Sequence, residues 1–514
     1  MKKLKGTKVS NIQRRDFVKS ISVGATGISL GCVFEPAIAA QRAFLNRPVN
    51  RPVPGKKPNV IIIFCDQLRS SALGCYGNKF VKTPNIDRLA QNGFLFEHGI
   101  SNSPVCTPAR SNLMSGQHSR TCVGSRANEM SIDDGRFGRN DRLKFKDQTI
   151  AEEFKKLGYK TALIGKWHVD TRPSRLGFDE SLMPGSIFTK GSFSKNEGQT
   201  YPVPGFTTDH EITKAKEYIS SNKNSDDPFF LYYNIISPHM PILDVPYRYS
   251  HMYNPREVPL RKNVWIDGEL ACDEKWFHIY MWQTFYNQNY QPITAKASPD
   301  FTLKDLTALY YGAVTWVDDT VGEILKSLKE TGQDDNTLIV FSSDHGDMLG
   351  SHHEWNKDRL YEEAIRIPMI YNWPGKIRPG TNNNQVASLI DVMPTLLDLC
   401  GGTIPDSVQG QSMTPILNGQ KEHLVKDFTF IETSRCVMGI RTPTHLYGIL
   451  LNNDDTAIED DRYQFYDLKA DPYELNNLAK TDNSTALANE FREKLVKWDK
   501  ETPRLKGLKY KPWS

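Results

Sequence analysis

Apolar runs of strand length recur along the chain, and helical patterns precede some of them. The runs are rich in β-branched and aromatic residues and too short for a core helix, which predicts strands buried on both faces. They are Asn59–Cys65, Lys160–Gly165, Pro228–Ser237 and Thr337–Ser343. The segments that follow Thr149 and Val317 place apolar residues at i, i+3 and i+4, as amphipathic helices do. This alternation predicts an α/β fold with a large, mostly parallel sheet flanked by helices.

Polar side chains follow each of these predicted strands. They are Asp66 and Gln67, Lys166 and His168, His239, and Asp344 and His345. Any one of them alone has the composition of a turn or a helix cap. Ligands of such sheets bind outside the carboxyl ends of the strands, so the recurrence predicts that these side chains converge on one site.

The pattern changes after residue 400. Short segments near residues 428–432, 437–442, 445–451 and 463–468 have the alternation of antiparallel strands, and residues 484–500 have the pattern of a helix. The sequence therefore predicts a catalytic α/β domain over residues 58–425 and a smaller C-terminal α+β subdomain over residues 426–514.

Residues 1–40 are predicted to be an export signal. The segment is basic up to Lys19, continues with a short apolar run and offers a small-residue cleavage site at Ala37–Ala39. Arg14-Arg15 resembles the twin-arginine signal of bacteria. A membrane anchor fits less well because a spanning helix needs about 20 apolar residues. We therefore expect a bacterial protein that the export machinery delivers to the periplasm or the exterior, with residues 41–57 as an extended leader.

Charge and cysteine content exclude other classes of protein. The chain has 64 Lys and Arg and 60 Asp and Glu; removing residues 1–40 takes away seven and two of these, which leaves a net charge of about −1. A mature chain without a basic excess is not expected to bind nucleic acid. The seven cysteines beyond Cys32 are scattered, which argues against a zinc site or a dense disulfide framework. Cys32 is an alternative lipidation site, although Ser29 stands where such signals carry a large aliphatic residue.

One cysteine stands out by its neighbours. Cys106 precedes Thr107-Pro108, and proline is tolerated in the first turn of a helix, where its missing N–H costs nothing. A helix that begins here would bring free N–H groups and its positive dipole end to the thiol and lower the thiol pKa. Arg110 lies about one turn later and adds a fixed positive charge. On chemistry alone, Cys106 is interpreted as an exposed, activated nucleophile beside an anion site.

The segment Cys106-Thr-Pro-Ala-Arg110, followed by Leu113-Met-Ser-Gly116, resembles the signature of the formylglycine-dependent (type I) sulfatases of the alkaline-phosphatase-like superfamily. Further segments match that family in order and cover most of residues 58–400: NVIIIFCDQ, TPNIDRLA, GKWH, SPHMP, VDDTVG, DNTLIVFSSDHGDMLG and EEAIRIPMI. In this family a maturation enzyme oxidises the cysteine of the motif to Cα-formylglycine. The resemblance implies an alkaline-phosphatase-like fold and a sulfuric ester hydrolase.

The resemblance also implies a site for a divalent cation, usually Ca²⁺. Its ligands would be Asp66, Asp344, His345 and the modified Cys106, and hard oxygen ligands suit Ca²⁺. The family often has a second aspartate where this chain has Gln67, whose amide oxygen still coordinates but without a negative charge. Many relatives have asparagine where this chain has His345, and imidazole is a less usual ligand for Ca²⁺.

Catalytic roles follow from the same resemblance. The residues concerned are Cys106, Arg110, Lys166, His168, His239 and Lys357. Arg110 and Lys166 would hold the hydrated formylglycine, and His168 would orient it and take its proton. His239 and Lys357 would bind the sulfate and assist the leaving oxygen.

An exported sulfatase is expected to act on sulfated carbohydrates. Residues 245–300 form an aromatic-rich insertion, whose rings either stack on sugars or pack the insertion itself. The nearest alternative function is a phosphodiesterase or phosphonate monoester hydrolase of the same superfamily, which shares the Asp-Gln and Asp-His variants. A carbohydrate-binding protein with an inactive site is a second alternative, which the complete catalytic set disfavours. His352 and His353 are interpreted as loop residues.

Overall fold

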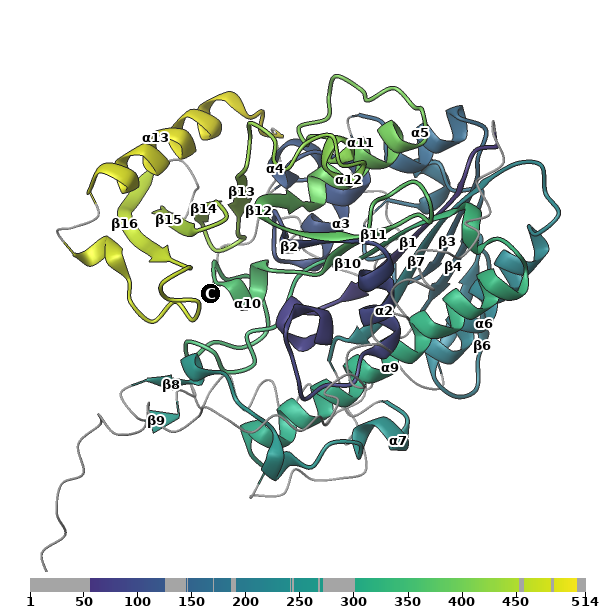
Figure 1. Ribbon diagram of the computed structural model, residues 1–514, viewed down its shortest axis with the longest axis horizontal. Coiled ribbons are helices and arrows are strands. Elements are labelled where there is room, and N and C mark those ends of the chain that lie inside the picture. Colours follow the sequence, from purple (N-terminus) through teal and green to yellow (C-terminus); the bar gives the residue numbers. More distant parts are fainter. Residues whose placement is uncertain are drawn as a thin grey trace, which may run out of the picture. The chain divides into compact units, whose positions relative to one another are not determined.

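The computed structural model describes residues 56–124, 145, 147–169, 171–185, 191–240, 242, 245–266, 269–270, 301–452, 457–481 and 485–505 (Figure 1). These residues belong to one compact unit, residues 51–514. The predicted export signal, Cys32 and the aromatic residues between 271 and 300 lie outside the described residues. No helix within the described part of the chain has the length and apolar character needed to cross a membrane.

The main sheet of the described residues has ten strands in the order β12-β2-β11-β10-β1-β7-β3-β4-β5-β6. Its centre is parallel and consists of β10 (Thr337–Ser343), β1 (Asn59–Asp66), β7 (Phe229–Pro238), β3 (Lys160–Gly165) and β4 (Glu180–Pro184). The outer strands are β2 (Phe94–Ile100), β11 (Met369–Asn372), β12 (Gly380–Ser388), β5 (Ser192–Lys195) and β6 (Thr200–Pro202). Of these, β11, β5 and β6 run antiparallel to their neighbours. The prediction of a large, mostly parallel sheet is confirmed.

Helices cover both faces of this sheet because successive side chains of a strand point to opposite faces. Ile61 and Ile63 of β1 pack in one core with α2 (Pro84–Asn92), α6 (Thr207–Ser221) and α9 (Leu303–Glu330). Ile62 and Phe64 pack in a second core with α3 (Cys106–Ser115), α5 (Ile150–Lys156), α11 (Leu389–Leu399) and α12 (Thr414–Leu417). Figure 1 shows these two sets of helices on opposite sides of the sheet.

Side-chain caps define where several of these helices begin. The Thr149 and Glu152 side chains form a reciprocal capping box at the start of α5, and Ser388 with Asp391 does the same for α11. Thr302 with Asp305 caps α9, which therefore begins well before the predicted start at Val317. The sequence pattern missed this first part of α9 because it is buried around most of its circumference and shows little amphipathic contrast.

Part of the aromatic insertion packs against α9. Tyr249, in the short helix α7 (Tyr247–Ser250), stacks on Trp316 with ring centroids 6.0 Å apart, and the Tyr253 hydroxyl lies 2.7 Å from Thr315 Oγ1. These two rings therefore serve packing. Trp265 is 47% exposed and lies in β8 (Trp265–Ile266), which pairs with β9 (Glu269–Leu270).

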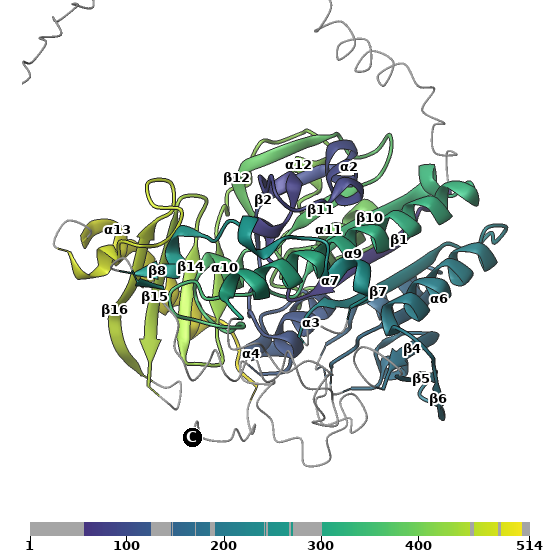
Figure 2. The same cartoon turned by 90° about the horizontal axis from the view of Figure 1, so that it is seen from below.

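A second, antiparallel sheet follows the main one in sequence. It consists of β13 (Thr429–Glu432), β14 (Val437–Arg441), β15 (His445–Leu451) and β16 (Ile458–Asp467). One face packs against α13 (Thr485–Glu501), and the other shares a core with Ile100, Leu360 and Ile365 beside the main sheet (Figure 2). The predicted C-terminal strands and helix are confirmed, while the proposed boundary at residue 425 stays a prediction.

Three further short helices connect these parts. They are α4 (Ser119–Cys122), α10 (Glu362–Ile365) and the 3₁₀ turn η6 (Lys262–Val264). The remaining 3₁₀ turns are η1 (Ser70–Ala72), η2 (Gly74–Tyr76), η4 (Pro173–Leu176), η5 (Pro255–Glu257), η7 (Asp334–Asn336) and η8 (Leu478–Lys480).

Candidate active site

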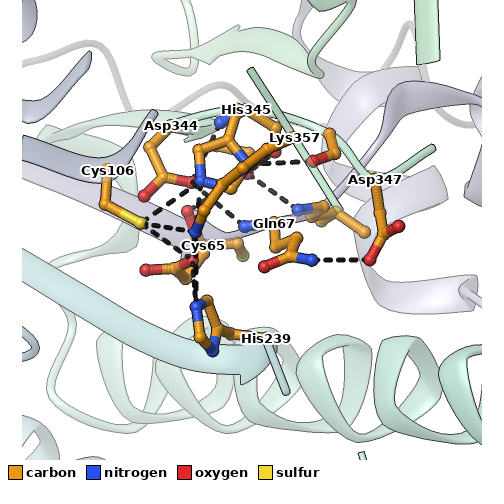
Figure 3. Close-up of polar contacts among 12 residues, drawn as sticks. Cys65, Gln67, Cys106, His239, Asp344, His345, Asp347 and Lys357 are labelled. Atoms are coloured by element: carbon orange, nitrogen blue, oxygen red, sulfur yellow. Dashed lines mark hydrogen bonds and ion pairs between the residues drawn. The ribbon is translucent and has the colours of Figure 1, made fainter. Parts of the chain in front are cut away.

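The polar residues that follow the parallel strands meet at one edge of the sheet, as the sequence predicts. Asp66 ends β1, Asp344 follows β10, His239 follows β7 and Lys166 follows β3. These strands are parallel neighbours, so their carboxyl ends lie side by side. Figure 3 shows Asp344 and His239 grouped around Cys106 together with His345 and Lys357.

Cys106 is the first residue of α3, which confirms the predicted helix start. The expectation of an exposed thiol is wrong, because the side chain packs among the strand ends and the residue is only 1% exposed. Its sulfur lies 2.9 Å from Lys357 Nζ, 3.3 Å from His345 Nε2 and 4.0 Å from Lys166 Nζ. Burial alone raises the pKa of the thiol, but these three groups outweigh burial and hold the pKa well below its usual value.

Arg110 anchors the two carboxylates of the site. Its Nη2 lies 2.9 Å from Asp66 Oδ2 and 3.0 Å from Asp344 Oδ2, and all three side chains are fully buried. Its Nη1 donates to Asn234 Oδ1 at 2.8 Å. The sequence analysis missed Asn234, whose only signal is an amide within the otherwise apolar strand β7.

Lysine and histidine side chains complete the positive side of the site. Lys166 Nζ lies 2.5 Å from Asp66 Oδ2. Burial and the charge of Cys106 raise the pKa of Asp66, yet Lys166, His239 and Arg110 hold it well below its usual range. Asp66 therefore stays ionised in the buried site.

The two candidate proton-transfer histidines occupy different positions. The Nδ1–H of His239 donates to the carbonyl oxygen of Met240 at 2.6 Å, which leaves Nε2 directed toward Lys357 Nζ at 3.3 Å. His168 has a left-handed backbone conformation (φ 50°), and its carbonyl accepts a hydrogen bond from Thr107 Oγ1 in α3. Burial lowers the pKa of His168 to about 4, against a hydrogen bond with Cys106 that raises it.

Ligand atoms for a cation gather beside the sulfur. Asp66, Cys106, Asp344 and His345 each offer one such atom, and these atoms all lie within 4.8 Å of one another. Burial and the neighbouring Asp66 raise the pKa of Asp344, because two carboxylates in one buried site repel each other. A bound cation would relieve this repulsion.

Two further observations test whether the residues fit a cation. The Nδ1–H of His345 donates to the carbonyl oxygen of Gly346 at 2.8 Å, so Nε2 is the ring nitrogen that faces the site and would bind a cation once deprotonated. Gln67 Oε1 is buried and has no hydrogen-bond partner within the part of the chain that the structure describes. A buried acceptor without a partner is costly unless a ligand satisfies it. The donor set therefore fits a divalent cation bound through oxygen and imidazole.

A second group of possible ligand atoms lies at the junction with the small sheet. His352, Glu363 and Glu474 place ligand atoms within 4.8 Å of one another. The amide nitrogen of Asn263 lies 2.8 Å from Glu363 Oε1 and 3.0 Å from His352 Nε2, so its NH₂ group already supplies donors to this cluster. The imidazole also stacks on Tyr361 with ring centroids 4.0 Å apart. This cluster therefore connects loops, which agrees with the interpretation of His352 as a loop residue.

A mostly parallel sheet with a buried cysteine, two carboxylates and several cationic side chains at its carboxyl edge defines a hydrolase of the alkaline-phosphatase-like class. The family model "Sulfatase" matches residues 58–402, and the model "N-sulphoglucosamine sulphohydrolase, C-terminal" matches residues 350–501. The chain belongs to the sulfatase family and is a sulfatase.

Three known proteins illustrate this relationship. An ulvan-active sulfatase of Formosa agariphila is 28% identical over 465 residues, which cover 86% of this chain and 81% of that protein. A solved structure in complex with D-glucosamine-2-N,6-O-disulfate has a TM-score of 0.71 at 24% identity and covers 87% of this chain and 98% of its own. The phosphonate monoester hydrolase of Agrobacterium radiobacter has a TM-score of 0.65 at 23% identity, covering 87% and 96%. The last two likenesses concern the fold.

Proposed function

We propose that this protein is an exported sulfatase that removes sulfate from sulfated carbohydrates. The observation that carries the proposal is the surroundings of Cys106, whose buried sulfur lies between Lys357, Lys166 and His345 at the N-terminus of α3. A substrate that bears one anionic ester group suits such a pocket. The printed names of the relatives, which act on ulvan or bind a sulfated glucosamine, support a carbohydrate substrate. The basic N-terminal segment with Arg14-Arg15 supports export.

The active form would carry Cα-formylglycine at position 106, made by a separate maturation enzyme. A thiol forms a stable bond to the transferred group, whereas a hydrated aldehyde has two hydroxyl groups, one to attack sulfur and one to release sulfate afterwards. Arg110 and Lys166 would hold these hydroxyl groups, and His168 would orient the second and accept its proton. The helix N-terminus and Lys357 would stabilise the charge that develops on the sulfate oxygens.

Asp66, Gln67, Asp344, His345 and residue 106 would hold one divalent cation, for which we propose Ca²⁺ because most of the ligands are oxygens. When bound, the cation supplies Lewis acidity to the nucleophile. Arg110 keeps both carboxylates in place through its paired contacts at 2.9 and 3.0 Å. His239 would protonate the leaving oxygen through Nε2, which lies 3.3 Å from Lys357 Nζ while the Met240 carbonyl holds Nδ1.

The oxidised cysteine is tested by mass spectrometry. The tryptic peptide Leu89–Arg110 from active protein should have a lower mass than its cysteine form and should not react with thiol reagents. The peptide Cys436–Arg441 in the same digest is the internal control and should react fully. Fully active protein with an unmodified thiol at position 106 would contradict the proposed chemistry.

The choice of ester is tested with a panel of substrates. We expect release of inorganic sulfate from sulfated oligosaccharides at a higher kcat/KM than hydrolysis of aryl phosphonates or phosphate diesters. The alternative function, a phosphonate monoester hydrolase or phosphodiesterase, is favoured by one observation, the pair Gln67 and His345 in the cation site. Faster turnover of phosphonates than of every sulfated sugar would move the protein to that class.

A further inference from the structure

Asp347 contacts the cation site without being one of its ligands. Gln67 Nε2 donates to Asp347 Oδ2 at 2.6 Å, and both residues are fully buried. Figure 3 shows the Gln67 amide with its nitrogen toward Asp347 and its oxygen on the opposite side, toward the group around Cys106. This oxygen has no hydrogen-bond partner among the described residues.

The two terminal atoms of a side-chain amide differ from each other, whereas those of an ionised carboxylate are equivalent. The two oxygens of an aspartate are equivalent, so either can face a cation, whereas a glutamine presents oxygen in one orientation and an NH₂ group in the other. An NH₂ group is a hydrogen-bond donor and would repel a cation. A chain with glutamine at position 67 therefore needs a contact that selects one orientation of the amide.

We propose that Asp347 is a positioning residue that turns the Gln67 amide so that its oxygen faces the divalent cation. This inference rests on the proposed function, because it requires the cation. An ionised carboxylate accepts hydrogen bonds and donates none, so its contact with the amide forms only when the nitrogen faces Asp347. The oxygen is then directed away from Asp347.

Both partners of this hydrogen bond are held in place. Asp347 Oδ1 accepts from the Leu349 backbone N–H at 2.9 Å. Gln67 has a left-handed backbone conformation (φ 67°), its N–H donates to Asp344 Oδ1 at 3.0 Å, and its carbonyl accepts from the Tyr310 hydroxyl at 2.8 Å. The backbone contacts thus fix where the Gln67 side chain lies. Asp347 then selects whether the oxygen or the nitrogen of the amide faces the cation site.

The test is a double-mutant cycle on Ca²⁺ affinity, measured by isothermal titration calorimetry on metal-stripped protein. Gln67→Ala removes the amide. In Asp347→Asn the side-chain oxygen would still accept from the Leu349 N–H, so an NH₂ group would face Gln67 and the contact that selects the native orientation would be lost. We expect Asp347→Asn to bind Ca²⁺ about 10- to 100-fold more weakly, as is typical for outer-shell partners of a metal site. Gln67→Ala, which removes a proposed ligand, should weaken binding at least as much. The double variant should bind no more weakly than Gln67→Ala, because Asp347 acts through the amide.

A second background keeps the test informative if Gln67→Ala disturbs the local structure. In Gln67→Asp the ligand is symmetric and its orientation is irrelevant, so adding Asp347→Asn should leave Ca²⁺ affinity unchanged. Asp318→Asn is the matched control, since Asp318 is equally buried but accepts hydrogen bonds from Asn85 and Ile86 at the start of α2. It should bind Ca²⁺ like the wild type.

The results separate three explanations. An equal loss from Asp347→Asn in all three backgrounds would mean that Asp347 acts through its charge and would overturn the positioning role. Unchanged affinity in Asp347→Asn together with lost affinity in Asp344→Asn would overturn the positioning role and leave the cation site intact. Unchanged affinity in Asp344→Asn as well would overturn the cation site of the proposed function, and the positioning role with it.

Discussion

Two buried charge clusters in this protein contain similar residues but differ in how completely their groups are paired. At the junction with the small sheet, Glu432 accepts hydrogen bonds from Ser119 Oγ, the Arg120 backbone N–H and Arg120 Nε, all at 2.8–2.9 Å. Arg120 also reaches Asp499 Oδ1 at 2.5 Å and lies over the Trp498 ring at 4.0 Å. In this junction cluster, Arg120 with Glu432 and Asp499, Arg504 supplies the second positive charge at 2.5 Å from Asp499 Oδ1, so the charges balance without any ligand.

The active site has the same types of charge with a different balance. Arg110 bridges Asp66 and Asp344, and Lys357 faces the sulfur of Cys106. The oxygen of Gln67, however, finds no hydrogen-bond partner in the described segments. Buried polar groups that are fully paired stabilise a fold. Buried polar groups without partners lower its stability, and a bound ligand can offset this cost by supplying the missing partner. The comparison therefore predicts that mutations in the active site change turnover and that mutations in the junction cluster change stability.

The largest expected effect comes from Cys106 in the active site. Cys106→Ala removes the proposed reacting group and should lower kcat by about 10⁴-fold or more. The fold should be retained, because the start of α3 is held by contacts other than those of the Cys106 thiol. Cys122→Ala in α4 is the matched control, since this thiol is also buried, and it should cost about 1 kcal/mol of unfolding free energy with kcat unchanged. Sulfate release and urea unfolding measure the two effects, and comparable kcat losses in both variants would remove the distinction.

At the junction cluster we expect the opposite result, a loss of stability with little change in turnover. Glu432→Gln removes the fully buried one of the two charge partners of Arg120 and leaves Asp499 alone, so it should lower the free energy of unfolding by up to about 3–5 kcal/mol. The folded fraction should keep its kcat. Glu490→Gln, which breaks an exposed pair with Lys494, should cost less than about 1 kcal/mol and serves as the control. A large loss of kcat in folded Glu432→Gln protein would show that the junction cluster is coupled to the active site.

The sequence predicted the active site better than the contacts that organise it. Asp66, Lys166 and Asp344 could be placed together because parallel strands end at one edge, a consequence of strand periodicity and topology alone. The roles of Asn234 and Asp347 could not be predicted, because they depend on which way a buried side chain points. The burial of Cys106 was missed for a related reason, since the packing of α3 against the strand ends is a property of the tertiary structure.

A buried carboxylate outside both clusters extends the comparison of paired and unpaired groups, because it should make the stability of the protein depend on pH. Neither carboxylate oxygen of Glu211 in α6 has a hydrogen-bond partner among the described residues, and burial raises its pKa to about 8. The folded state therefore favours the protonated form, so the stability that Glu211 contributes is complete below about pH 4.5 and is lost as the pH rises to about 8.

Glu211→Gln removes this titration and should flatten the pH dependence of stability. Between pH 5 and pH 8 the wild type should lose about 3 kcal/mol of unfolding free energy relative to the variant. Urea unfolding at both pH values measures this difference. Glu217→Gln, on the same helix and exposed, is the control and should follow the wild type. Parallel pH profiles for wild type and Glu211→Gln would show that Glu211 is ionised in the folded protein.

The smallest expected effect depends on the leaving group of the substrate. It distinguishes a residue that protonates the leaving oxygen from a residue that binds the sulfate. If His239 protonates the leaving oxygen, His239→Ala should slow sulfated sugars, whose alkoxide leaving groups are strongly basic, by about 100-fold. Activated aryl sulfates should be affected much less, because their leaving oxygen needs no proton. Lys357→Ala is the comparison, since a residue that binds the sulfate should slow both substrate classes alike. Measuring kcat on one sugar sulfate and a series of aryl sulfates separates the two roles, and a loss in His239→Ala that is independent of the leaving group would assign His239 to sulfate binding instead.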